Sequence, residues 1–194
     1  ESYLLQCLHP DRRITAGHAQ RISNSLKAIT WSLFESCNPA EAPAMARPLL
    51  RALLEQEGED AFILADALRY VPTAALSPED VEAMAAPLLR LSRGAVHHRI
   101  TALGLLEHLL PLAEQPLPLP LETMLQEAVQ DSEFSVRFLA VRLLRALDPR
   151  TCLEEPVDPA RLYLSNLKIA VHWTVKLVHI DALCGDVEAH PENA

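Results

Sequence analysis

The sequence predicts an all-α protein in which about three helical hairpins stack as a right-handed α-α superhelix, with flanking helices at both ends. Three observations support this class. The 35 Leu and 27 Ala residues far outnumber the 18 Val and Ile residues, and this balance favours helices over strands. A short motif recurs about 39 residues later, as expected of a repeat protein. With 49% hydrophobic residues, the chain can bury a core and is not expected to be disordered.

The first predicted element is an N-terminal capping helix within residues 14–42. Ile22, Leu26, Ile29 and Leu33 follow helical spacing, which predicts a helix over 18–36 with these residues on its buried face.

Three repeat units follow, and two independent sets of anchors give their period. MARPLLR at 45–51 matches MAAPLLR at 84–90 in six of seven positions, and Met124 begins a weaker copy. The second halves of the units end at Pro72, Pro111 and Pro149, which are 39 and 38 residues apart. The predicted units are residues 43–72, 78–111 and 121–149.

Each unit is expected to be a helix, a turn and a second helix. A lone hairpin cannot cover its own apolar stripe, so successive hairpins are expected to share one core. Within the units, we expect helices at 43–57, 60–71, 78–92, 96–110, 121–130 and 133–147.

Proline positions agree with these boundaries. Asn38-Pro39, Ser77-Pro78 and Asp158-Pro159 each offer a capping side chain followed by a proline, which is tolerated at the start of a helix. Pro48 and Pro87 fall inside the first helix of their units and predict an equivalent bend there.

The third unit carries the residues that resemble a known family. Its second helix is preceded by Asp131 and opens with Val136-Arg137, followed by Ala140 and Leu143-Leu144. With the interior prolines, this pattern resembles the HEAT repeat of the HEAT and armadillo-like α-solenoids, over roughly residues 43–149. The resemblance implies ladders in which Asp and Arg side chains join neighbouring units.

Only part of such a ladder can be placed on this chain. Counting back from the terminal prolines, Arg99 and Arg137 fit the Arg position, and Asp131 alone fits the Asp position. The first unit has Asp60 and Leu54 at these places, so it departs from the pattern.

The C-terminal part is predicted to form one or two apolar helices over residues 158–184. They could cap the row of hairpins or pair with a second copy of the chain, giving homo-association. Because the units share a core, residues 1–194 are expected to form a single helical domain.

Charge and cysteine usage narrow the possible partners. The net charge of −9 makes nucleic acid an unlikely ligand, and no apolar run is long enough to cross a membrane. Four widely separated cysteines indicate reduced thiols rather than a disulfide framework. We expect a soluble, intracellular and most simply cytoplasmic protein, which could be a piece of a longer chain.

No catalytic, cofactor-binding or metal-binding residues are predicted. The sequence lacks HExxH, GxSxG, Walker A and GxGxxG motifs. His97 and His98 are adjacent and are expected to point to different faces of their helix, which argues against a shared ion. The chain is therefore not expected to be an enzyme.

The predicted function is that of a protein-protein interaction scaffold or adaptor, which binds a protein partner of unknown identity through its repeat surface. Solvent-facing positions of the second helices are the candidate binding residues: Arg69, Glu107, His108, Arg142 and Arg145. The alternative is a structural segment of a larger multi-repeat assembly protein. A HEAT-like DNA glycosylase is a third possibility, which the negative charge and the two Trp residues, both outside the units, disfavour.

Overall fold

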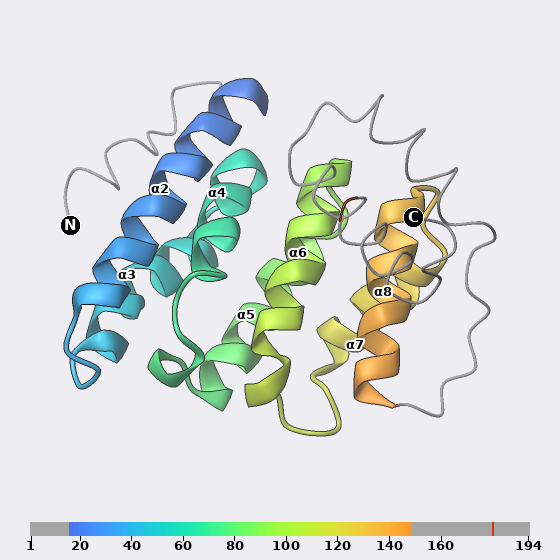
Figure 1. Cartoon of the computed structure of the whole chain (residues 1–194). Helices are drawn as coiled ribbons and strands as arrows, with labels where there is room; N and C mark the ends of the chain where they lie inside the picture. Colours follow the sequence, from blue (N-terminus) through green and yellow to red (C-terminus); the bar gives the residue numbers. More distant parts are fainter. Residues whose placement is uncertain (1–15, 149–179, 181–194) are drawn as a thin grey trace, which may run out of the picture.

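The computed structural model describes residues 16–148 and Ile180. Within that part of the chain it contains helices and no strands (Figure 1). The α-helices are α2 (Ala16–Ser36), α3 (Ala42–Glu55), α4 (Gly58–Leu68), α5 (Pro78–Leu91), α6 (Val96–Leu109), α7 (Leu119–Val129) and α8 (Phe134–Leu147). Two short 3₁₀ turns follow the first two hairpins: η1 (Thr73–Ala75) and η2 (Leu110–Leu112).

The helices are arranged in two rows. Helices α2, α4, α6 and α8 each contact the next member of one row, and α3, α5 and α7 do so in the other (Figure 1). Within each predicted unit, the first helix also packs against the second. Over the described residues the all-helical class is therefore confirmed, and the helices pack as successive hairpins, each against the next.

The core runs along the interface between the rows. In α4, every residue from 61 to 68 is buried, and α6 is buried on nearly all sides. Neighbours on both sides in the row, together with the hairpin partner, leave these two helices little solvent-facing surface. Met84 and Met124 lie in this core and Met45 packs against it, so the three recurring methionines share similar surroundings.

The helix starts show which of the predicted capping side chains and prolines mark the beginning of a helix. Ser77 caps α5 in a reciprocal capping box with Asp80, and Pro78 occupies the first turn. The expected Asn38 cap is wrong: α3 begins only at Ala42, and the Asn38 side chain instead accepts a hydrogen bond from the Ala40 N–H at 3.1 Å. Asn38 therefore shapes the turn before the helix. Pro48 and Pro87 both lie inside helices, as predicted.

Helix α2 packs against α4 with only part of the predicted face. Leu26 is buried and Ile22 packs against the core, but Ile29 and Leu33 are 41% and 45% exposed. The buried face carries two polar residues, Ser23 and Thr30, and a stripe of apolar residues alone does not reveal such a face.

Asp66 of α4 accounts for Ser23 on this face. The residue as a whole is only 1% exposed. It accepts a hydrogen bond from the Ser23 hydroxyl at 2.6 Å and lies 2.9 Å from the Lys27 ammonium. A buried carboxylate needs such partners, because desolvation without them costs several kcal/mol.

Several predictions fall outside the described residues: the helices at 158–184, the cap at Asp158-Pro159, and the proposed homo-association. Among the helices that the structure does describe, none combines the length and apolar character needed to cross a membrane.

Candidate functional site

A surface pocket of about 380 Å³ lies across the junction of the first and second units. The C-terminal end of α4 and the second half of α6 form it, with these lining residues: Arg69, Tyr70, Gly104, Glu107 and His108. We call this pocket the α4–α6 groove.

Gly104 gives the groove its floor. A Cβ atom at this position would lie only 2.9 Å from Cζ of Arg69. The Arg69 guanidinium therefore lies across α6 where the side chain is missing. Within the described residues its polar contact is Asp66 at 3.5 Å, so most of its five N–H donors remain available.

The other polar side chains of the groove are tied to neighbouring helices. His108 donates a hydrogen bond from Nε2 to the Val71 carbonyl oxygen at 2.7 Å. Glu107 accepts one from Nη2 of Arg142, also at 2.7 Å. The Arg142 guanidinium in turn lies 5.9 Å from the ring centre of Phe138. These contacts hold α4, α6 and α8 in one register beside the groove.

The structure brings together four of the five predicted binding residues. Arg69, Glu107 and His108 line the groove, and Arg142 joins it through Glu107. Arg145 is half-buried on α8 and does not line the groove. The expectation of solvent-pointing side chains is too simple, because all five are only partly exposed.

Sequence reasoning missed Tyr70 and Gly104. Tyr70 lies two residues beyond the end of α4 and is 44% exposed. Gly104 is an isolated glycine in a helical pattern, which often has a packing reason.

Ion pairs also join successive units. The best buried of them links the Arg99 guanidinium to Asp131, with Nε–Oδ2 at 2.8 Å and Nη2–Oδ1 at 3.2 Å. Arg99 and Arg137 each donate to the carbonyl oxygen five residues earlier, in Gly94 and Ser132. The two arginines thus occupy equivalent places, and Arg99 pairs with Asp131, the residue that fits the Asp position in the next unit.

Other inter-unit pairs are more exposed. Arg93 donates two hydrogen bonds to Glu127, at 2.6 and 3.1 Å, and these lower the pKa of the Glu127 carboxyl. Because both side chains are about half exposed, the pair adds little stability. Arg99–Asp131, at 21% and 13% exposure, is the stronger candidate for fixing the register between units.

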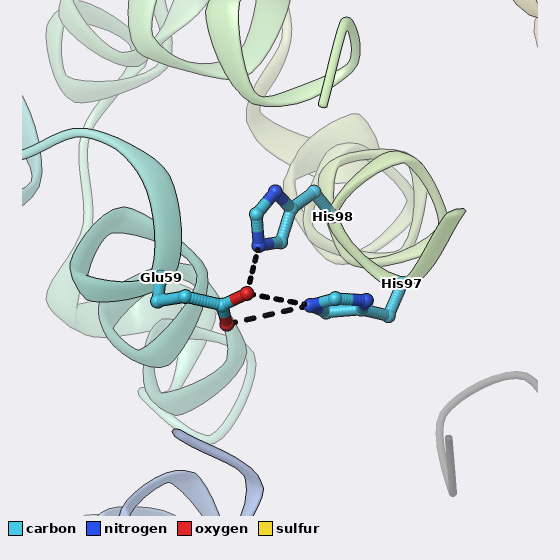
Figure 2. A group of neighbouring side chains, drawn as sticks. All are labelled: Glu59, His97 and His98. Atoms are coloured by element: carbon cyan, nitrogen blue, oxygen red, sulfur yellow. Dashed lines mark hydrogen bonds and ion pairs between the residues drawn. The ribbon is translucent and has the colours of Figure 1, made fainter. Parts of the chain in front are cut away.

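A second cluster of polar groups lies between α4 and α6 (Figure 2). Nε2 of His97 and Nε2 of His98 each lie 3.3 Å from Oε1 of Glu59. Oε2 of Glu59 is 3.4 Å from Nε2 of His97. The expectation that His97 and His98 point apart is wrong. Their directions differ by about 100° around the helix, and the long imidazoles lean toward Glu59, which lies between those directions.

The surroundings of this cluster are apolar and tight. Phe62 packs edge-on against His97 at 4.9 Å and tilted against His98 at 5.6 Å between ring centres. Burial lowers the pKa of His98 and the charge of His97 lowers it further, whereas Glu59 opposes both effects. Burial also raises the pKa of the neighbouring Asp60, and the Glu59 charge raises it further.

No family model matches the sequence, and no curated protein or solved structure shows significant similarity to it.

Proposed function

We propose that this chain is a HEAT-like α-solenoid that acts as an interaction scaffold. In this proposal, an extended segment of another protein binds along α4, α6 and α8, with the α4–α6 groove as the central contact. Successive hairpins of nearly equal length, packed in two rows, are the arrangement that gives solenoids an elongated binding surface.

The observation that carries the proposal is the composition of the groove. Four groups that differ in chemistry meet there across two units: the Arg69 guanidinium, the Tyr70 ring, the Glu107 carboxylate and the His108 imidazole. Mixed charges and an exposed aromatic ring suit a peptide with both backbone and side-chain groups to satisfy. A polyanion would instead be repelled by the Glu107 carboxylate in the groove and by the net charge of −9 of the chain.

The partner's chemistry follows from the available donors. Because Arg69 has one long contact with Asp66, its remaining N–H groups can bind a carboxylate or backbone carbonyls of the partner. The Tyr70 ring supplies apolar contact area beside them. The expected partner segment therefore carries an acidic residue next to an apolar one.

Photo-cross-linking tests this function. A photoreactive phenylalanine analogue replaces Tyr70 in the full chain, and the same analogue replaces Leu54, which is 42% exposed on the opposite row. We expect discrete protein adducts from position 70 and only background from position 54. Adding Arg69→Gln to the position-70 variant should remove those adducts. Equal labelling from both positions, or adducts that survive Arg69→Gln, would show that the groove is not the binding site.

A further inference from the structure

We propose that Glu59, His97 and His98 form a binding site for one zinc ion, which joins the first repeat unit to the second. Two imidazole nitrogens and one carboxylate oxygen are a common zinc donor set, and three protein ligands leave the fourth position for water or another ligand. This inference is independent of the proposed function of the groove.

The separations between Glu59 and the two rings match those between ligands of one zinc ion. A good N–H···O bond has a donor–acceptor distance of about 2.7–3.2 Å, and the distances from Glu59 to the two rings are 3.3–3.4 Å. A tetrahedral zinc ion with bonds of about 2.0–2.1 Å holds its ligand atoms about 3.3–3.4 Å apart. The three candidate ligand atoms all lie within 4.8 Å of one another.

Unsatisfied buried groups provide a second argument. His98 is 7% exposed, and its Nε2 atom makes no hydrogen bond within the described residues. Glu59 forms no ion pair there with Lys or Arg, and the two histidines are its ion-pair partners. A cation between these atoms would satisfy the lone pair of His98 Nε2 and the Glu59 carboxylate at once.

Gly94 and an adjoining pocket lie next to the His98 ring of this site. A Cβ at Gly94 would lie 2.5 Å from Nδ1 of His98, so the glycine leaves room for that ring. A pocket of about 190 Å³, lined in part by His98, Gly94 and Gly58, lies beside the His98 ring. Arg90 and Arg93 also line it, but each is paired with a carboxylate, of Glu57 and Glu127 respectively.

Calorimetric titration of the chelator-treated full chain with zinc chloride tests the site. We expect one zinc per chain from this site, with affinity at least about tenfold weaker in His98→Gln and in Glu59→Gln. The matched control is His108→Gln, which removes another α6 histidine outside the cluster and should leave zinc affinity unchanged. Far-UV circular dichroism confirms that each variant is folded.

Cobalt(II) provides a readout that needs no affinity comparison. In the unmodified chain, Co²⁺ should give the intense visible absorption of a four-coordinate ion, and His97→Gln/His98→Gln should abolish that absorption. Absence of zinc binding by the unmodified chain would overturn the proposal. So would zinc affinity and a cobalt spectrum that persist in the double variant, because other histidines of the chain would then hold the metal.

Discussion

At the scale of single residues, glycines and buried charges decide what the structure tolerates. Three described glycines have three different reasons for their place. Gly58 has φ of 58° at the start of α4, a conformation that other residues rarely adopt. Gly94 leaves room for a buried imidazole and Gly104 for the end of an arginine side chain. Of these two side chains, only the flexible end of Arg69 can move aside freely.

Gly94→Ala is expected to destabilise the protein by about 1–3 kcal/mol, the usual cost of overpacking. The new methyl group would meet Nδ1 of His98 at 2.5 Å and the ring's Cγ at 3.2 Å, and a buried ring cannot swing away. Urea-induced unfolding, followed by far-UV circular dichroism, measures the change.

Gly104→Ala is the matched control for that substitution. Its methyl group meets the flexible end of Arg69, and alanine favours a helix over glycine by about 1 kcal/mol. Its stability should therefore be unchanged or slightly higher. Equal destabilisation by both substitutions would mean that the environments of Arg69 and His98 are not as described.

At the scale of helices, the attachment of α2 depends on a buried charge. Asp66→Ala is expected to destabilise the protein by about 3 kcal/mol, because it leaves the Lys27 ammonium, 13% exposed, without its partner in the interface. The Ser23 hydroxyl loses its acceptor as well. Chemical denaturation gives the free energy of unfolding.

An exposed carboxylate on another helix serves as the reference. Glu82→Ala, in α5, should change the stability by less than about 0.5 kcal/mol. If Asp66→Ala lowers the free energy of unfolding no more than Glu82→Ala does, then the attachment of α2 does not depend on the contacts of Asp66 with Ser23 and Lys27.

Helix positions were predictable from the sequence to within a few residues, because proline placement, the Ser77 cap and apolar spacing all act locally. The buried face of α2 was not, since it depends on Asp66, 43 residues from Ser23 in the chain. The convergence of His97 and His98 was missed for the same reason. Glu59 belongs to the previous unit, and only the packing of α4 against α6 places its carboxylate between the rings.

The α4–α6 groove could be predicted from the sequence only in part. A fixed offset from the repeat identified Arg69, Glu107 and His108, because equivalent positions of stacked hairpins share a face. The same offset could not show that Arg69 would cross Gly104. That contact depends on side-chain direction as well as on register.

At the scale of the whole molecule, the central claim is that the hairpins are interchangeable layers of one stack. Deleting residues 73–111 removes the entire second unit and joins Pro72 to Leu112, which copies the natural Pro111-Leu112 junction. Helix α4 could then pack against α8, and α3 against α7, as α4 and α6 or α3 and α5 do in the intact chain. Deleting residues 92–117 is a shorter change, but it removes α6 and leaves α5 without its hairpin partner.

Thermal unfolding of the two deletion variants, followed by far-UV circular dichroism, is the most direct test of this claim. If the hairpins are layers of one stack, the longer deletion retains its helical signal per residue and one cooperative transition, whereas the shorter deletion loses both. If the whole-unit deletion unfolds while removal of α6 alone is tolerated, or if both variants are equally disrupted, the hairpins are not equivalent layers and the account is wrong.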